Sequence, residues 1–474
     1  MLEKCEKSHI SHWKNVICFV IITIFVNDKN SNPMELRRDI IEKLLEWKKS
    51  PDRKPLIISG ARQIGKTWLM KHFGKEYFKH TAYFNFDNSE ELCREFENTK
   101  DPERLIGILG LYADCPITPG ETLIIFDEIQ QSNRALNSLK YFCEDAPEYC
   151  IIAAGSLLGV ALSHGESFPV GKVDFLQMYP VTFKEFLRVD DPKCHDYLDG
   201  LGSIETLPEI IMNRATESYR RYMTCGGMPG AAVAMLENHG TGAVEKEQAN
   251  ILQAYTLDFA KHAPTREIPR ITSIWNSIPS QLARENRKFV YKLVKPGARS
   301  REYEDALLWL QQAGLIYRVF CLSKPGLPLS AYDDVSSFKI YTCDTGLLRS
   351  LAALPPDIFW TSNPLYQEFQ GALTENAILQ ALLPDFNPMP RYWTSNGTAE
   401  VDFIVQDGLD VIPIEVKSGT NTSGKSLSVY VKKYAPQLSI IYSRNNLRLA
   451  DSIIHIPLFL ADWTKKLIRI ANGG

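Results

Sequence analysis

Residues 60–67 (GARQIGKT) have the types and spacing that hold phosphate groups. They follow an apolar run of strand length at residues 55–59 and precede a helical stretch that ends near residue 78. In this P-loop pattern, glycines let backbone N–H groups surround phosphate oxygens, and the helix adds the positive end of its dipole. The lysine would reach the β- and γ-phosphates, and the threonine would ligate Mg²⁺. The pattern predicts an ATP and Mg²⁺ site formed by Gly60, Ala61, Arg62, Gln63, Ile64, Gly65, Lys66 and Thr67.

A second group of chemically competent residues ends the run at residues 123–128 (LIIFDE). Four apolar residues in a row predict a buried parallel strand, and ligands bind at the carboxyl ends of such strands. Asp127 would hold Mg²⁺, and Glu128 would orient and deprotonate the attacking water. A strand that merely ends in a solvated acidic turn is the alternative. The P-loop about 60 residues upstream weighs against that alternative.

Further apolar runs at residues 83–86, 150–154 and 173–176 would complete a sheet around these two groups. With crossover helices between the runs, the pattern predicts an α/β fold built on a parallel sheet. The run at 150–154 leads to Gly155 and Ser156. Ser156 is a candidate sensor of the γ-phosphate during catalysis. The competing interpretation makes it the N-cap of the helix that follows.

The segments GARQIGKT, LIIFDEIQ, AAGSLL, MYPVTFKEFL and CGGMP occur here in this order. With these motifs the chain resembles the AAA-type ATPases of a large bacterial and archaeal family, from residue 34 nearly to the C-terminus. Members of that family carry a C-terminal domain of unknown function that is similar to PD-(D/E)XK nucleases. The resemblance implies that the Gly-Gly-x-Pro element, Gly226 to Pro229, lies in a helical lid over about residues 194–262.

One departure from the family concerns a basic residue. Many members have Gly-Arg shortly before the P-[LV]-[ST]-F segment, whereas this chain has Gly171 and Lys172. Lysine supplies charge but lacks the bidentate fork of arginine. Other candidates for an arginine finger are Arg134, Arg220 and Arg221, and an ordinary surface role is open for each.

Residues 266–330 are expected to form a winged-helix-like connector. Apolar residues at helical spacing predict helices over 268–282 and 303–314, followed by a strand at 315–319 and a turn near Pro325 and Pro328. The stretch from residue 284 to 301 carries seven basic residues and only one acidic one, Glu285. Such a stretch could neutralise DNA phosphates, or it could be the solvated surface of an interdomain module.

From about residue 331, the expected elements are a helix at 368–383, strands at 391–394, 401–405 and 411–416, a helix at about 427–434 and a strand at 438–442. This is the order of the PD-(D/E)XK core, and the resemblance to the family implies the same fold. Asp402 and Glu415 would share Mg²⁺, Lys417 would activate water or stabilise charge, and Glu375 could complete the metal site. The alternative is a buried ion network in an inert domain, because fold does not establish activity.

Composition sets the outer limits. The 474 residues suggest about three domains, and 53 Lys and Arg against 56 Asp and Glu leave a net charge of −3. A basic surface must therefore be local. The ten cysteines have no C-x-x-C spacing, which argues against zinc or redox motifs and favours a reducing cytoplasm. The expected domains are an extension at 1–33, the ATPase core and lid at 34–265, the connector at 266–330, and the nuclease-like domain at 331–474.

The extension contains an apolar run at residues 16–26, which is short for a membrane span. It is interpreted as a mis-assigned start or dispensable tail, an interfacial anchor or a signal peptide, and a membrane partner is not expected. The whole chain predicts an ATPase whose nucleotide state controls a nuclease-like or DNA-interacting part. A nucleotide-gated scaffold or signalling switch with an inert nuclease fold and an ATP-regulated endonuclease are the alternatives. A homo-oligomer fits the family resemblance, because AAA-type ATPases often place a neighbour's arginine in the site.

Overall fold

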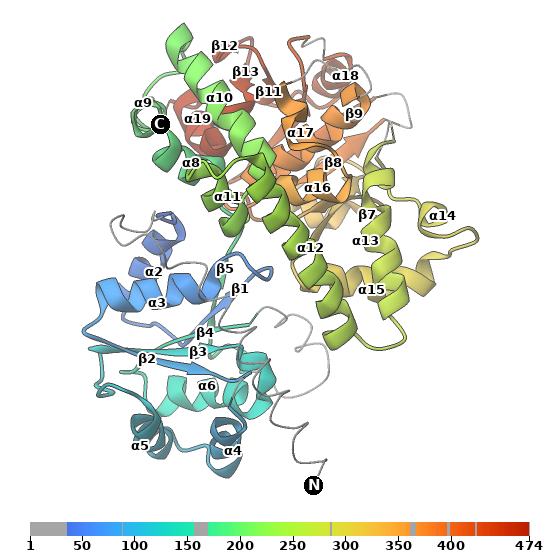
Figure 1. The fold of residues 1–474 in the computed structure, drawn as a ribbon. Helices are drawn as coiled ribbons and strands as arrows, with labels where there is room; N and C mark the ends of the chain where they lie inside the picture. The colour runs from blue at the N-terminus through green and yellow to red at the C-terminus, as the bar shows by residue number, and fades with distance from the viewer. Residues whose placement is uncertain are drawn as a thin grey trace. The chain divides into compact units, whose positions relative to one another are not determined.

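The computed structural model describes residues 36–87, 89–155, 169–284, 287–360, 366–395, 399–421 and 424–473 (Figure 1). Contacts divide the chain into two units, Met1–Arg37 and Arg38–Gly474, and the second contains all the elements below. The extension at 1–33 and Ser156 lie outside the described residues. Within the described residues, no helix has both the length and the apolar character needed to cross a membrane.

The first part of this unit is built on a five-stranded sheet in the order β2-β3-β4-β1-β5. Every neighbouring pair in it is parallel, so the predicted α/β fold is confirmed. The strands are β1 (Leu56–Ser59), β2 (His80–Asn85), β3 (Thr122–Asp127), β4 (Cys150–Ala154) and β5 (Asp174–Gln177). The helices are α2 (Ile40–Lys49), α3 (Lys66–Tyr77), α4 (Glu90–Asn98), α5 (Pro102–Tyr112), the 3-10 turn η1 (Ile129–Gln131) and α6 (Asn133–Asp145).

Helices α4, α5 and α6 lie on one face of this sheet and α2 and α3 on the other (Figure 1). The core beneath α4 and α6 is aromatic. Phe126 of β3 makes edge contacts with Phe86, Phe96 and Phe142, whose ring centroids lie 5.6, 5.7 and 6.4 Å away. Such large apolar rings dominate core energetics, and they hold β3 at a fixed depth in the sheet. The acidic end of β3 is thereby fixed in position as well.

The region predicted to form a lid is helical. It contains α8 (Phe183–Asp190), α9 (Pro192–Asp199), α10 (Glu209–Cys225), α11 (Pro229–Leu236) and α12 (Thr241–His262). The two helices predicted for the connector are α13 (Ile268–Leu282) and α15 (Ser300–Gln312), with the short α14 (Tyr291–Val294) between them. The strand expected as a wing is β6 (Ile316–Leu322).

The last part contains an eight-stranded mixed sheet in the order β12-β13-β11-β10-β9-β8-β6-β7. Its further strands are β7 (Asp333–Thr342), β8 (Arg391–Thr394), β9 (Glu400–Asp407), β10 (Asp410–Val416), β11 (Ser439–Ser443), β12 (Arg448–Ala450) and β13 (Ile453–Pro457). Its helices are η3 (Leu329–Tyr332), α16 (Thr345–Leu351), η4 (Pro356–Trp360), α17 (Gln367–Leu382), α18 (Lys425–Tyr434), η6 (Leu458–Trp463) and α19 (Thr464–Ala471). Because β6 pairs with both β7 and β8, the boundary expected at residue 330 falls between paired strands of this sheet.

Candidate functional site

The loop between β1 and α3 takes a conformation that requires its glycines. Gly60 has φ +148°, and a Cβ atom added there would lie 2.4 Å from the carbonyl oxygen of Met178. Gly65 has φ +92° and stands directly before the first residue of α3. Any L-residue with a side chain is strained at these angles. The glycines therefore let the backbone curl tightly enough for its N–H groups to surround an anion at the helix N-terminus.

Lys66, the first residue of α3, is turned inward against this loop. Its ammonium group donates hydrogen bonds to the carbonyl oxygens of Gly60 and Ala61, at 2.9 and 2.7 Å. Burial lowers the pKa of Lys66 to about 8, although the nearby carboxylates of Glu128 and Asp127 oppose that shift. A phosphate group in the loop would add negative charge next to the ammonium and favour its protonated form.

The side chain of Asp127 collects two hydroxyl groups at the carboxyl end of β3. Thr67 Oγ1 donates to Asp127 Oδ2 at 2.7 Å, and the phenol of Tyr83 donates to the same oxygen at 2.9 Å. Burial, followed by the charge of Asp127, raises the pKa of Tyr83, so the phenol stays protonated and donates. Threonine hydroxyl and carboxylate oxygens are the hard ligands that Mg²⁺ prefers. The residue types and their proximity therefore fit a magnesium ion held by Thr67 and Asp127.

Glu128 follows β3 directly and has a left-handed backbone conformation, with φ +51°. Few residues other than glycine adopt this conformation, which is found mainly at turns and functional sites. Its Oε2 accepts a hydrogen bond from Gln130 Nε2 at 2.5 Å. The turn thus presents a second carboxylate next to the one on Asp127, as the sequence pattern indicates.

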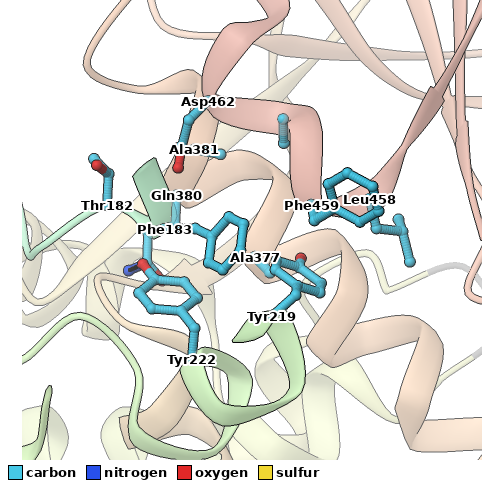
Figure 2. Close-up of a pocket in the computed structure, with 11 residues that line it drawn as sticks. Thr182, Phe183, Tyr219, Tyr222, Ala377, Gln380, Ala381, Leu458, Phe459 and Asp462 are labelled. Carbon is cyan, nitrogen blue, oxygen red and sulfur yellow. Dashed lines mark hydrogen bonds between the residues drawn. The ribbon is translucent and has the colours of Figure 1, made fainter. Parts of the chain in front are cut away.

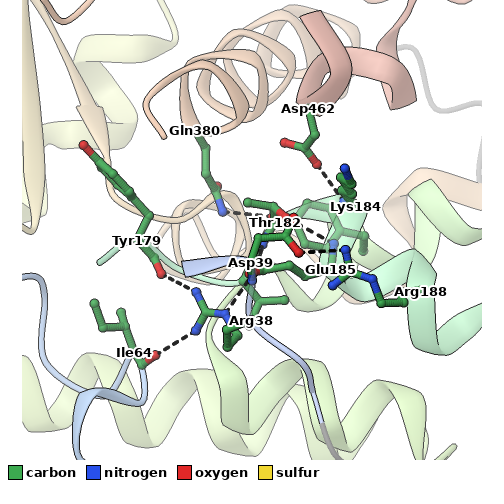
Figure 3. Close-up of polar contacts among 12 residues, drawn as sticks. Arg38, Asp39, Ile64, Tyr179, Thr182, Lys184, Glu185, Arg188, Gln380 and Asp462 are labelled. Atoms are coloured by element: carbon green, nitrogen blue, oxygen red, sulfur yellow. Dashed lines mark hydrogen bonds and ion pairs between the residues drawn. The ribbon is translucent and has the colours of Figure 1, made fainter. Parts of the chain in front are cut away.

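A buried ion pair between Arg38 and Glu185 contacts the P-loop (Figure 3). Arg38 and Glu185 are 5% and 3% exposed, and Arg38 Nε lies 3.1 Å from Glu185 Oε2. The same guanidinium donates to the carbonyl oxygens of Ile64 in the P-loop and Tyr179, at 3.2 and 2.7 Å. Glu185 also forms the capping box of α8 with Thr182. Arg38 therefore ties the P-loop to the segment that follows β5.

Helix α12 also contacts the P-loop. Arg62 forms an ion pair with Asp258, and the hydroxyl of Tyr255 donates to the carbonyl oxygen of Arg62 at 3.0 Å. Burial raises the pKa of Asp258, and the charge of Arg62 opposes this shift. The side chain of Arg62 is therefore engaged by the lid, while its backbone remains part of the loop.

The arginine-finger candidates are exposed or half-buried, and three of the four form ion pairs within the chain. Lys172 pairs with Glu144 at 2.9 Å, and Arg221 pairs with Asp190 at 2.8 Å. Arg220 lies 3.4 Å from Glu217, and Arg134 is exposed on α6. Nothing in these contacts singles out one of the four, so the identity of the finger stays a prediction.

The predicted nuclease-like residues lie in a buried network of charges. Glu375 on α17 accepts a hydrogen bond from the phenol of Tyr341 at 3.0 Å and forms an ion pair with Arg287. The ammonium group of Lys339, fully buried, lies 3.8 Å from Glu375 and also pairs with Glu400. Both oxygens of Glu375 are thus engaged by donors. The ammonium group of Lys339 therefore supplies a positive charge next to the carboxylates of Glu375 and Glu400.

Asp402 and Glu415 lie on the neighbouring strands β9 and β10. Asp402 Oδ2 accepts the N–H of Val416 at 2.7 Å, and Glu415 Oε1 lies 2.5 Å from the ammonium of Lys417. Burial and the charge of Asp402 raise the pKa of Glu415. The other oxygen, Glu415 Oε2, is buried without a hydrogen-bond partner among the described residues. Across that part of the chain, no group of three or more His, Cys, Asp or Glu side chains could hold a metal ion.

The arrangement therefore does not fit a three-carboxylate metal site. Glu375 accepts hydrogen bonds through both of its oxygens. The acidic cluster, which consists of Glu375, Glu400, Asp402 and Glu415, also contains the positive charges of Arg287, Lys339 and Lys417. Three positive charges against four carboxylates leave little net charge for a divalent cation to neutralise.

The basic stretch at residues 284–301 separates into two groups. Arg287 pairs with Glu375, and Lys288 donates to the hydroxyl of Ser337 at 2.8 Å, so both are engaged with the C-terminal sheet. The other five basic residues are exposed and form no ion pair with any described residue; they are Arg284, Lys292, Lys295, Arg299 and Arg301. These five are called the basic surface below.

Comparison with sequence families identifies the first part of the chain. Residues 52–187 match the AAA domain family. They form an AAA-type P-loop ATPase domain. Residues 216–357 and 370–460 match two domains of unknown function, DUF8612 and DUF4143. The boundary of the AAA domain match encloses the P-loop, Asp127, Glu128 and Glu185. Among curated proteins, none matches the chain significantly.

The solved structures similar to the chain include the following three, all at low sequence identity. The Walker-type ATPase PABY2304 of Pyrococcus abyssi is 16% identical, with 68% of this chain and 99% of that chain covered and a TM-score of 0.43. The RuvB Holliday junction branch migration motor of Thermotoga maritima is 14% identical, covering 60% and 90%, with a TM-score of 0.29. The ORC1 protein of Aeropyrum pernix, solved in complex with DNA, is 13% identical, covering 67% and 91%, with a TM-score of 0.27.

Three residues of the AAA domain site have no counterpart in the sequence patterns above: Tyr83, Arg38 and Glu185. Tyr83 lies within an expected strand, and the register that pairs Asn85 with Asp127 brings it beside the site. A hydroxyl two residues before the end of a strand next to the acidic one is a signal that could have been used. Arg38 and Glu185 are 147 positions apart, and no local pattern connects them.

Proposed function

We propose that the AAA domain binds ATP with Mg²⁺ and hydrolyses it. The observation that carries this proposal is the convergence of the Thr67 and Tyr83 hydroxyls on one oxygen of Asp127, next to the glycine-shaped loop and Lys66. These groups come from three different elements, β2, β3 and α3. Their assembly at one point supports a nucleotide site more strongly than any one motif.

Each side chain has a distinct role in this proposal. The P-loop N–H groups and the Lys66 ammonium bind the phosphates and stabilise the charge that develops on them. Thr67 and Asp127 hold Mg²⁺, which supplies Lewis-acid polarisation of the phosphate oxygens. Glu128 orients the attacking water and accepts its proton. Arg38 is a positioning residue, because it acts on the loop through the carbonyl of Ile64.

Two variants test the site. Lys66→Ala should abolish ATP–Mg²⁺ binding, whereas Glu128→Gln should bind ATP but hydrolyse it slowly in a single turnover. Lys75→Ala, an exposed lysine on the same helix, is the matched control and should behave as wild type. Unchanged ATP affinity in Lys66→Ala would refute the site assignment. Equal single-turnover rates in wild type and Glu128→Gln would favour a non-catalytic, nucleotide-gated scaffold.

We propose further that the nucleotide state is transmitted to the C-terminal sheet. The Gly226–Pro229 loop is in contact with both parts. Gly227 accepts a hydrogen bond from the N–H of Val181 at 2.7 Å, and its own N–H donates to Asp344 Oδ2 at 2.5 Å. Asp344 is buried and caps α16. A shift of the segment after β5 would therefore be transmitted through Gly227 to Asp344 and to helix α16.

The basic surface supports a role for this protein in binding DNA. Five exposed cationic side chains without ion pairs among the described residues would each release a counterion on contacting a phosphate. The double variant Lys295→Gln/Arg299→Gln should reduce the slope of log affinity against log salt by about two. Lys246→Gln, exposed on α12, is the control. Equal salt slopes in the double variant and in the control would count against this surface.

A difference in DNA affinity between the ATP and ADP states would support transmission of the nucleotide state to the C-terminal part.

For the acidic cluster, the contacts favour the inert alternative over an endonuclease. Lys339 and Arg287 already neutralise Glu375 and its neighbours. Plasmid DNA incubated with the protein and Mg²⁺ or Mn²⁺ should stay intact in wild type and in Asp402→Ala alike. Cleavage by wild type that disappears in Asp402→Ala would restore the endonuclease interpretation.

A further inference from the structure

A cavity of about 140 Å³ lies at the end of the parallel strands of the C-terminal sheet. Strands β10, β11 and β13 run parallel, and the residues at or just after their carboxyl ends line the cavity, Ser418, Arg444 and Pro457 among them. In parallel sheets, ligands bind in the crevice outside these ends of the strands. None of the P-loop residues and none of the four residues Glu375, Asp402, Glu415 and Lys417 lines it. The cavity is therefore distinct from the sites described above.

Two helices form its walls. Helix α10 contributes Thr216, Tyr219, Arg220 and Met223, whose spacing of three and four places them on one helical face. Helix α17 contributes Gln370 and Thr374, which lie four positions apart. Tyr219, together with Leu458 and Phe459, also lines the smaller cavity of Figure 2, which has a volume of about 10 Å³. A volume of that size holds one water molecule at most.

The charge of the larger cavity is positive. Arg220 and Arg444 line it, and no Asp or Glu does among the residues that the structure describes. Arg220 lies 3.4 Å from Glu217, whereas Arg444 forms no ion pair with any described residue. The positive charge of Arg444 also acts on the Tyr366 hydroxyl, where it opposes the effect of burial on the pKa. A ligand for this cavity would therefore carry negative charge.

The side chain of Tyr366 lines the cavity, but its hydroxyl is inaccessible to solvent. An acceptor group placed in the cavity would therefore contact Arg444, which is exposed, and not this hydroxyl.

The size and the remaining walls define the rest of the ligand. Met223, Phe359 and Phe459 give the cavity an apolar, largely aromatic side. A dry cavity of about 150 Å³ accommodates one benzene molecule. We propose that this cavity is a second ligand site, which binds a small anion with a single aromatic ring, its phosphate or carboxylate held by Arg444.

Calorimetric titration of the full chain with phenyl phosphate, benzoate and inorganic phosphate tests the proposal. Excess ADP and Mg²⁺ are present throughout to occupy the P-loop. One equivalent of phenyl phosphate or benzoate should bind, each more tightly than inorganic phosphate, and the tighter of the two identifies the anionic group. Arg444→Gln should weaken binding about tenfold or more, since hydrogen bonds to charged groups are the strong ones. Arg448→Gln, exposed on β12, is the matched control.

The proposal is overturned if neither aromatic anion binds at millimolar concentration, or if Arg444→Gln binds as wild type does. It is also overturned if the anion binds only when ADP is omitted, because the anion then occupies the P-loop.

Discussion

Replacement of Arg38 by methionine should destabilise the AAA domain by about 3 to 5 kcal/mol, the usual cost of removing one partner from a buried ion pair. Arg38 and Glu185 are 5% and 3% exposed, so both charges are almost fully buried. In the variant, Glu185 keeps the N–H donors of Asp39 and Thr182, at 2.6 and 2.9 Å. It loses its positive partner, and the Ile64 carbonyl loses a donor.

Urea unfolding followed by circular dichroism measures this cost, with Arg188→Met as the control. Arg188 pairs with Asp39 at 2.7 Å, but the two side chains are 23% and 46% exposed. A pair of that kind contributes about 0 to 1 kcal/mol. The double variant Arg38→Met/Glu185→Gln should recover part of the loss, because it leaves no unpaired buried charge.

The same variants should also affect nucleotide binding. Arg38 donates to the carbonyl of Ile64, so its loss should weaken ATP binding at temperatures where the variant is still folded. If Arg38→Met unfolds at the same urea concentration as Arg188→Met and binds ATP as wild type does, the guanidinium does not support the loop. The contact between Arg38 and the Ile64 carbonyl in Figure 3 would then be without effect on the P-loop.

Three further predictions concern single positions. Gly60→Ala should abolish ATP binding and lower the melting temperature, because the new methyl group would lie 2.4 Å from the carbonyl of Met178; Gly107→Ala, in open space on α5, should do neither. Burial raises the pKa of Asp462 to about 7, so the native state holds a proton that the unfolded chain releases near pH 4. That contribution to stability is lost as the pH rises towards 7, and Asp462→Asn should therefore be more stable than wild type at pH 8 but not at pH 3 in matched melting curves. Lys339→Met should cost about 3 to 5 kcal/mol in urea unfolding, because it removes the positive partner of Glu400 from a buried network of charges.

Local sequence patterns were sufficient to predict the P-loop and the strand that ends in Asp127. Both depend on residues close together in the chain, namely glycines before a helix and an apolar run before two carboxylates. The same reasoning located all five strands of the parallel sheet and the strands from β8 to β11. Runs of apolar residues are visible in the sequence wherever both faces of a strand are buried.

Partners distant in sequence could not be predicted in this way. The buried Lys339 lies on β7, and it meets Glu375 of α17 and Glu400 of β9 only through the order of the sheet and the packing of a helix on it. The strand β6 was expected in a wing, but it pairs with β7 and β8. The local pattern of a strand does not show which distant strands it pairs with. Ser156 lies outside the described residues, so its role as a sensor stays a prediction.

The sequence by itself therefore determined where the P-loop lies, because a P-loop is a local structure whose backbone angles depend on its own glycines. Only the tertiary structure decided which charges are paired. Arg38 meets Glu185 across 147 positions, and Lys339 lies among carboxylates of other elements. Ion pairs depend on distances of a few ångströms between side chains, and these distances are set when the sheets and helices pack together. For the same reason, the cationic cavity at the ends of β10, β11 and β13 has no signature in the sequence.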